Sequence, residues 1–166
     1  MQGDIAVIGL AVMGQNLILN MNDRGFTVVA YNRTTSKVNE FLANEAKGTN
    51  ILGAHSLEEL VGKLKRPRRV MLMVKAGKPV DELIDSLVPL LSKGDILIDG
   101  GNSYYKDDLR RGKALAAKGM HYVDAGTSGG VWGLERGYCL MIGGPAATVQ
   151  RLDPILRTLA PGIGNI

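Results

Sequence analysis

The stretch that decides the fold is Ile5-Ala6-Val7-Ile8-Gly9-Leu10-Ala11-Val12-Met13-Gly14. Its opening apolar run has no polar alternation, which is typical of a strand buried on both faces in a parallel sheet. A helical apolar pattern follows through Leu17 and Met21. Strand, glycine-containing turn and helix in this order predict a phosphate-binding turn, in which Gly9 allows the tight turn and Gly14 lets helix and strand pack closely.

Ala11 stands where such turns usually carry their middle glycine. Its methyl group adds bulk where the backbone would approach phosphates, so we expect the turn to sit slightly differently. The helix N-terminus would still offer free N–H groups and a positive dipole to a pyrophosphate. The alternative is an ordinary strand-to-helix turn that binds nothing.

Further apolar runs predict the remaining strands, and helical patterns lie between them. This alternation predicts a Rossmann-like, doubly wound α/β fold with a mainly parallel sheet and helices on both faces. We expect residues 1–166 to form a single dinucleotide-binding domain. The further predicted strands are Val28–Tyr31, Val70–Val74, Ile96–Ile98, His121–Val123 and Cys139–Ile142.

Several helix boundaries can be predicted from local signals. Ser56 and Glu59 form a capping box, Pro79 fits a first helical position, and Pro89 should kink or loosen its helix. A cation followed by glycine is expected to close four helical patterns. These pairs are Arg24-Gly25, Lys47-Gly48, Lys93-Gly94 and Lys118-Gly119.

Composition narrows the possible functions. The single cysteine excludes an intramolecular disulfide and a cysteine-based zinc site, and with two histidines we expect no metal centre. No apolar run reaches the ~18 residues of a membrane span, so we expect no membrane partner and a cytoplasmic location. The cluster Lys63–Arg69 could bind nucleic acid, but a solvated helix end is the favoured interpretation, because nucleic-acid-binding proteins usually have a larger basic face.

The end of the second predicted strand indicates which nucleotide binds. It reads Tyr31-Asn32-Arg33-Thr34, without the acidic residue that usually meets a free ribose 2′-hydroxyl. A guanidinium grips a 2′-phosphate, which a carboxylate would repel. Arg33, with Asn32 and Thr34 as hydrogen-bonding residues, therefore favours NADP over NAD. The alternative is a polar loop with a solvated arginine.

Two glycine-rich loops, Asp99–Ser103 and Asp124–Gly130, follow later strands, at the edge where open α/β sheets bind ligands. Asn102 and Ser128 supply hydrogen bonds suited to hydroxyls or a carboxylate, although such loops often only turn the chain. No catalytic set emerges. Asp99 and Asp124 could be structural caps, and Cys139 is expected to be a small core residue.

Several strings together resemble the N-terminal coenzyme domain of the 6-phosphogluconate dehydrogenases, within the β-hydroxyacid dehydrogenase family. The resemblance covers nearly the whole chain. After Gly130 the chain reads Val131–Tyr138 and resembles a shorter bacterial branch of that family. The strings that carry the resemblance are Ile8–Leu17, Tyr31–Thr34, Phe41–Gly48, Val74–Gly77, Asp99–Ser103 and Ser128–Gly130.

The resemblance implies an NADP site made by several loops. The turn Gly9–Gly14 would hold the pyrophosphate, Asn32–Thr34 the adenosine end, and Val74–Ala76 the cofactor path, while Asn102 would touch cofactor and substrate. The implied cofactor-binding residues are Gly9, Leu10, Ala11, Val12, Met13, Gly14, Asn32, Arg33, Thr34, Val74, Lys75, Ala76 and Asn102.

The resemblance also implies a substrate and a reaction. Asn102, Ser128, Gly129 and Gly130 would bind 6-phosphogluconate, which is oxidised at its 3-hydroxyl and decarboxylated to ribulose 5-phosphate. In the family, the catalytic lysine and glutamate and most of a homodimer interface belong to a following all-helical domain. We therefore expect this chain alone to bind cofactor without efficient turnover. The alternatives are the coenzyme domain of a sibling 3-hydroxy acid dehydrogenase and a non-catalytic nucleotide-binding module.

Overall fold

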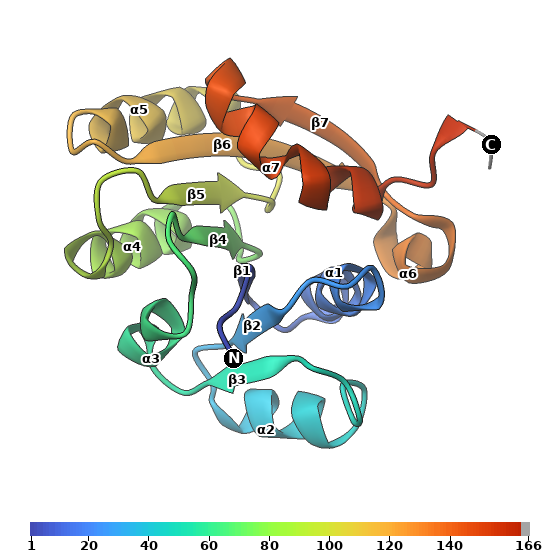
Figure 1. The fold of residues 1–166 in the computed structure, drawn as a ribbon. Coiled ribbons are helices and arrows are strands. Elements are labelled where there is room, and N and C mark those ends of the chain that lie inside the picture. The colour runs from blue at the N-terminus through green and yellow to red at the C-terminus, as the bar shows by residue number, and fades with distance from the viewer. Residues whose placement is uncertain (164–166) are drawn as a thin grey trace.

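The structure of the chain, a computed structural model, describes residues 1–163 (Figure 1). Its centre is a seven-stranded sheet in the order β3-β2-β1-β4-β5-β6-β7. All neighbouring strands pair in parallel except β6 and β7, which are antiparallel. The strands are β1 (Ile5–Ile8), β2 (Val28–Tyr31), β3 (Leu52–Ala54), β4 (Arg69–Leu72), β5 (Ile96–Asp99), β6 (His121–Ser128) and β7 (Cys139–Gly143).

Helices connect the parallel strands and cover both faces of the sheet (Figure 1). This arrangement confirms the predicted doubly wound α/β fold. The helices are α1 (Val12–Asp23), α2 (Ser36–Ala43), α3 (Leu57–Gly62), α4 (Lys78–Leu87), α5 (Tyr105–Ala116), α6 (Gly133–Arg136) and α7 (Ala146–Leu159), with short 3₁₀ helices η1 (Val88–Leu90) and η2 (Gly130–Trp132).

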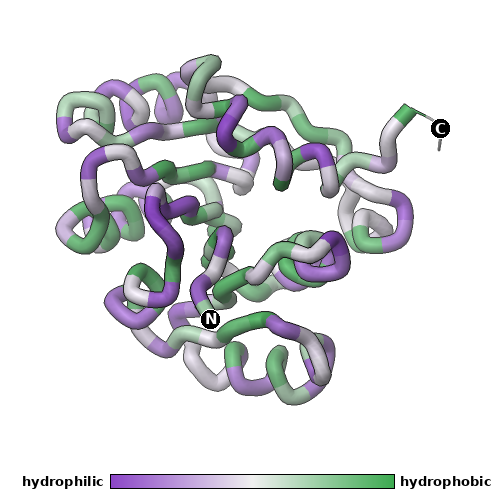
Figure 2. The backbone as a smooth tube through the Cα atoms, in the orientation of Figure 1, coloured by the Kyte–Doolittle hydropathy of each residue, from purple (hydrophilic) through white to green (hydrophobic). Residues whose placement is uncertain are grey.

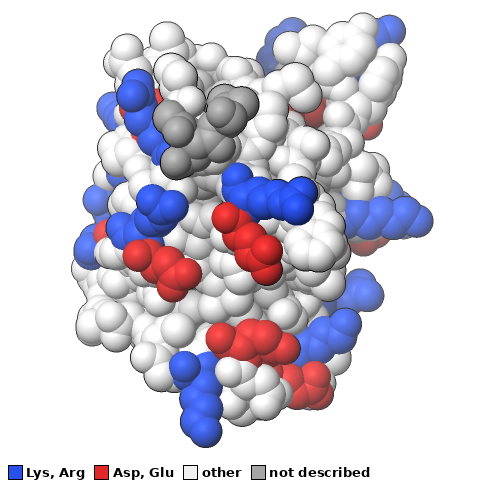
Figure 3. Space-filling view, turned by 90° about the vertical axis from the view of Figure 1, so that its right-hand side faces the viewer, with Lys and Arg blue, Asp and Glu red and all other residues white. Residues whose placement is uncertain are grey.

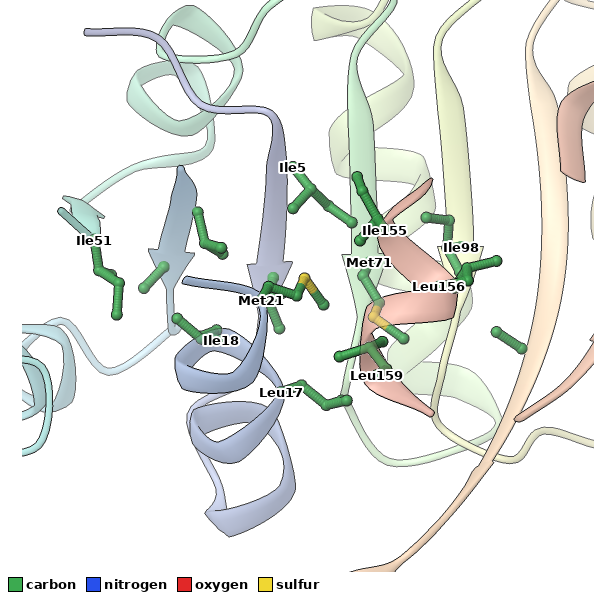
Figure 4. Packing of buried hydrophobic residues seen from close by; sticks show 14 of the residues in the cluster. Ile5, Leu17, Ile18, Met21, Ile51, Met71, Ile98, Ile155, Leu156 and Leu159 are labelled. Carbon is green, nitrogen blue, oxygen red and sulfur yellow. The ribbon is translucent and has the colours of Figure 1, made fainter. Parts of the chain in front are cut away.

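Alternate residues of the strands belong to two hydrophobic cores, one on each face of the sheet. In β1, Ile5 and Val7 face α1, α2 and α7, whereas Ala6 and Ile8 face α3, α4 and α5. Figure 2 shows hydrophobic residues along the strands, while the outer helices alternate between hydrophobic and hydrophilic. Figure 4 shows side chains of α1 and α7 packed together over the sheet. Burial of each large apolar side chain contributes ~1.5–3 kcal/mol, so these two cores hold the helices against the sheet.

Three strand predictions need correction. β3 was missed, because Leu52-Gly53-Ala54 has no apolar run and is stabilised by pairing with β2. β6 continues to Ser128 through residues predicted as a loop, because antiparallel pairing with β7 extends it. Cys139 is exposed and not in the core, since β7 is an edge strand with one open face.

The helix signals are largely confirmed. The Ser56 side chain accepts a hydrogen bond from the Glu59 amide at 3.1 Å, although the Glu59 carboxylate reaches the His55 amide instead of Ser56. Pro79 lies in the first turn of α4, and the α-helix gives way to η1 at Pro89. The glycines of the four cation-glycine pairs all have positive φ. Lys47-Gly48 and Lys93-Gly94, however, lie beyond the ends of their helices, in turns.

No helix in the described part of the chain is long and apolar enough to cross a membrane.

Candidate functional site

The turn after β1 depends on the absence of two side chains. Gly9 has φ +112°, and a Cβ there would overlap the Met73 carbonyl. A Cβ on Gly14 would overlap the carbonyl oxygen of Gly9 itself. α1 therefore starts pressed against the turn, which is the close packing the sequence predicted for Gly9 and Gly14.

The first turn of α1 lacks a capping side chain. Its N-cap residue is Ala11 in an extended conformation, and no side chain caps the helix there. Ala11 and Val12 are both exposed. The N–H groups at this end of α1 and their dipole therefore face outward, in the arrangement that binds anionic groups.

Asn32 ties the end of β2 to this turn. Its Oδ1 accepts a hydrogen bond from the Leu10 amide at 3.1 Å, and its Nδ2 donates to the Thr34 carbonyl at 3.2 Å. Gly9 also donates its amide to the Tyr31 carbonyl at 2.9 Å. Both ends of the Asn32 amide are thus used to shape the loop around Arg33.

A cavity of about 650 Å³ opens beside this loop. Arg33 and Thr34 are exposed at it, and Val74 and Lys75 line it from the loop after β4. The structure thus brings together the ends of β1, β2 and β4 at one edge of the sheet. The cavity is lined by Ile8, Gly9, Tyr31, Asn32, Arg33, Thr34, Leu57, Val74, Lys75, Pro79, Glu82, Leu83 and Ser86.

The sequence analysis missed the part of this lining that comes from α3 and α4. Pro79, Leu83 and Ser86 recur at helical spacing and face the cavity from α4, and Leu57 does so from α3. Glu82 brings a carboxylate to the same wall, where it pairs with Lys78 at 3.2 Å. The spacing on α4 was visible in the sequence, but only the tertiary fold brings that helix to the same cavity as the end of β2.

The second predicted loop lies next to β6. Asn102 has φ 56° and is the only non-glycine residue with positive φ in the described part of the chain. Its Nδ2 donates to the Thr127 carbonyl at 3.1 Å, and its Oδ1 accepts from the Thr127 amide at 3.0 Å. The side chain therefore clamps the β5 loop onto β6, which a sequence pattern could not show.

Ser128, Gly129 and Gly130 follow at the end of β6 and are all exposed. From there η2 and α6 pass over α1, and Asn16 donates to the Val131 carbonyl at 3.3 Å. Figure 1 shows α6 beside α1. The chain thus brings the Ser128–Gly130 segment to the same side of the molecule as the turn after β1.

Beneath the Asn102 loop, Asp99 acts as a cap, as one interpretation of the sequence proposed. It is fully buried, and its Oδ1 accepts from the Gly101 amide at 2.9 Å. Its Oδ2 accepts from the hydroxyls of Ser103 and Tyr122. The carboxylate is thus enclosed by its own loop.

Two further acids lie close to Asp99. Burial raises the pKa of Asp108 to about 6, with the charge of Asp99 adding to the effect and a hydrogen bond from Tyr122 opposing it. Burial and the charge of Asp99 also raise the pKa of Asp124. The carboxyl groups under this loop therefore favour at least one proton in mildly acidic solution.

The basic cluster Lys63–Arg69 follows the end of α3, as expected, but only part of it is solvated. α3 ends at Gly62, and the cations that follow are largely paired within the protein. Lys65 contacts Asp4 at 2.7 Å, and the Arg68 side chain, only 11% exposed, contacts Asp95 at 3.0 Å. On the face with α1 and α6, basic and acidic side chains are interspersed (Figure 3). Neither arrangement offers a basic face for nucleic acid.

Comparisons with known proteins agree with this geometry. The family model described as the NAD binding domain of 6-phosphogluconate dehydrogenase matches residues 4–165. The decarboxylating 6-phosphogluconate dehydrogenase of Schizosaccharomyces pombe is 62% identical over 162 residues, which are 98% of this chain and 33% of that protein. The enzyme of Haemophilus influenzae is 60% identical over 159 residues, 96% of this chain and 33% of that protein.

Solved structures give the same result. Plasmodium falciparum 6-phosphogluconate dehydrogenase, studied in its apo form and with NADP⁺ or 6-phosphogluconate, superposes with a TM-score of 0.91 at 40% identity, over 98% of this chain and 35% of that one. Mycobacterium tuberculosis 3-hydroxyisobutyrate dehydrogenase, at 23% identity and a TM-score of 0.83 over 97% of this chain and 53% of that one, shares the fold. The chain spans about a third of the length of the curated relatives it matches. It belongs to the family of NAD-binding domains of 6-phosphogluconate dehydrogenase.

Proposed function

We propose that residues 1–166 form one dinucleotide-binding domain that binds NADP and serves the oxidative decarboxylation of 6-phosphogluconate to ribulose 5-phosphate. The observation that carries the proposal is the cavity shared by Gly9 and Arg33. It combines the turn that begins at Gly9, where a pyrophosphate can approach the backbone, with an exposed guanidinium at the end of β2.

The cavity and the turn that begins at Gly9 offer surfaces for the adenosine and pyrophosphate parts of the cofactor. The turn Gly9–Gly14, made of Gly9, Leu10, Ala11, Val12, Met13 and Gly14, would hold the pyrophosphate with backbone N–H groups. Arg33 and Thr34 would bind the 2′-phosphate, while Asn32 holds their loop in place. The apolar side chains of Leu57 and Leu83 would contact the adenine ring.

The remaining predicted residues continue this path. Val74, Lys75 and Ala76 would line the cofactor between β4 and α4, and Asn102 would meet its nicotinamide end. Ser128, Gly129 and Gly130 would bind the sugar acid together with Asn102. When bound, NADP supplies a hydride-accepting nicotinamide ring. The residues of this chain bind and orient both molecules.

The family resemblance also bears on the cellular location and the oligomeric state of the full-length protein. We expect the full-length protein to work in the cytoplasm as a homodimer, as the family resemblance implies. The two alternative functions give other outcomes. A sibling 3-hydroxy acid dehydrogenase would act on a smaller acid, and a non-catalytic module would bind nucleotide without any turnover when joined to a helical domain.

The decisive experiment is a calorimetric titration of the chain with NADP and with NAD at one moderate salt concentration. We expect NADP to bind more tightly. Arg33→Glu should weaken NADP binding by about tenfold to a hundredfold, because it replaces a charge-assisted hydrogen bond with repulsion, and should change NAD binding little.

The matched control is Lys47→Glu. Lys47 is also exposed and basic, but it follows α2, at the opposite edge of the sheet from the cavity. It should leave both affinities unchanged. Equal losses for NADP and NAD in Arg33→Glu would show that Arg33 does not contact a 2′-phosphate, and binding of neither nucleotide to the parent chain would refute the proposed domain function.

A further inference from the structure

Arg111 in α5 is a buried cation with partners on a loop distant in sequence. Its side chain is 2% exposed, and it donates from Nε and Nη2 to the two carboxylate oxygens of Asp81 at 2.8 and 3.2 Å. Nη2 also donates to the Gly77 carbonyl at 3.1 Å. Gly77 is the N-cap of α4 and Asp81 lies in its first turn. These bonds hold the end of the loop that carries Val74 and Lys75.

The third nitrogen of the same guanidinium faces the other loop. Nη1 lies 3.6 Å from Asp99 Oδ2 and 3.6 Å from Asp108 Oδ1. Asp99 in turn accepts hydrogen bonds from Gly101 and Ser103, which flank Asn102. The Tyr122 hydroxyl links the two acids, at 3.1 Å from Asp99 and 2.6 Å from Asp108. One guanidinium thus faces Asp81, in the helix that follows the first loop, and Asp99, the strand residue from which the second loop starts.

This arrangement depends on the shape of arginine. A buried charge is tolerated only when its partners remain in place, since loss of one partner of such a pair costs about 3–5 kcal/mol. The planar guanidinium is rigid, so its hydrogen bonds to Asp81 and Gly77 also fix where Nη1 lies relative to Asp99, whereas a lysine ammonium would not. Movement of either loop would therefore disturb contacts with the other.

Arg110 provides an internal comparison. It also contacts Asp81, at 3.1 Å, but its side chain is 57% exposed and its other acidic contact is Asp107 in its own helix. Arg110 therefore adds a positive charge near the Val74–Gly77 loop, but its ion pairs within the described residues do not extend to Asp99 or the Gly100–Ser103 loop.

We propose that Arg111 is a positioning residue that holds the Val74–Gly77 loop and the Gly100–Ser103 loop in one fixed arrangement, so that the middle of the dinucleotide and its nicotinamide end are bound at once. The part concerning the dinucleotide rests on the proposed function. The part concerning the two loops stands on the contacts alone.

The first test is amide hydrogen exchange on the chain without ligand. In Arg111→Lys, both loops should exchange faster by at least about tenfold, while β1 and β4 keep their protection. Arg110→Lys should match the parent protein. Faster exchange in one loop only, or in neither, would overturn the proposal. If Arg111→Lys does not fold, Asp81→Asn replaces it, because Asp81 is one-third exposed, and the same paired change is expected.

The second test compares NADP with adenosine 2′,5′-bisphosphate, which lacks the nicotinamide half. In the parent chain NADP should bind more tightly, and the ratio of the two dissociation constants measures the contribution of that half. Arg111→Lys should reduce this ratio to about one, whereas Arg110→Lys should preserve it. General destabilisation would not change a ratio measured on folded protein. An unchanged ratio in Arg111→Lys would refute the positioning role.

The two tests separate the two ideas. If neither nucleotide binds the parent chain, the proposed function fails, and hydrogen exchange alone decides whether Arg111 couples the loops. If both nucleotides bind but exchange in the two loops is unaffected by Arg111→Lys, the proposed function stands and the coupling is refuted.

Discussion

At the scale of a single residue, the turn after β1 leaves no space for a methyl group at Gly14. A Cβ would overlap the Gly9 carbonyl, and backbone cannot move aside as a flexible side chain can. Gly14→Ala should lower the free energy of unfolding by about 1–3 kcal/mol, measured by urea denaturation. The control is Gly62→Ala in α3, where a Cβ would meet nothing within 4 Å. That variant should be neutral or more stable by up to about 1 kcal/mol.

Glu82 allows a second prediction at this scale. Its carboxylate lines the cavity that we assign to the 2′-phosphate side of NADP, and it is only partly neutralised by Lys78. Glu82→Gln should therefore tighten NADP binding by about twofold to fivefold at low salt, a modest gain because the group is exposed. The gain should disappear at high salt, where exposed charges are screened.

Asp85→Asn is the matched control for Glu82→Gln. Asp85 is an exposed acid on the same helix, but it does not line the cavity. The same tightening in both variants would mean that general charge, and not a contact in the cavity, governs affinity.

At the scale of elements, the junction of α5 with β5 and β6 should respond to pH. Asp108 has a pKa of about 6 in the folded protein because of burial, against about 4 in an unfolded chain. Between these values the folded state binds more protons, so the free energy of unfolding attributable to Asp108 falls as pH rises. Asp108→Asn removes this loss. Relative to the parent, the variant should gain about 1–3 kcal/mol between about pH 4 and pH 7, measured by denaturation at each pH.

Asp81 should show the opposite sign. Hydrogen bonds from Arg111, which outweigh the effect of burial, hold the pKa of Asp81 below its usual value. The ionised carboxylate therefore contributes stability that is lost as pH falls below about 4. The deficit of Asp81→Asn relative to the parent should shrink on acidification. If the two variants responded to pH in the same direction, the assignment of these charges would be wrong.

Signals within a few neighbouring residues were enough to predict most helices, strands and turns. The strand segments that the sequence analysis missed depend on pairing with strands distant in sequence. The turn at Gly9 and the cap at Ser56 depend on neighbouring residues, and both were predicted. β3 and the second half of β6 contain glycine and form because a partner strand lies beside them.

The same division applies to the candidate site. Arg33 could be singled out because its place at a strand end was visible in the sequence. The use of the Asn102 amide to clamp Thr127, and the burial of Arg111 on a polar helix, depend on which strands and helices become neighbours. The ligand contacts assigned to Asn102 and Ser128 stay predictions.

At the scale of the whole molecule, the carboxyl edge of the sheet gathers the ends of β1, β2, β4 and β5, with α6 folded back over α1. This edge offers surfaces for a cofactor, but the acid beneath the Asn102 loop is committed to structure. Asp99 is enclosed by Gly101, Ser103 and Tyr122, so it is not available to exchange protons with a sugar acid. Proton transfer requires a positioned group within hydrogen-bond reach of the substrate.

The 166-residue chain should therefore bind NADP without oxidising 6-phosphogluconate. With saturating NADP and 6-phosphogluconate, we expect no formation of reduced cofactor, followed by absorbance, while the full-length Schizosaccharomyces pombe relative assayed in parallel turns over. Joining this chain to the part of that relative that it does not match should give activity, because that part would then supply groups for proton transfer. Reduction that scales with the concentration of the chain alone would show that its own 166 residues contain those groups, and would redirect the search to Asp124 and the Ser128–Gly130 segment.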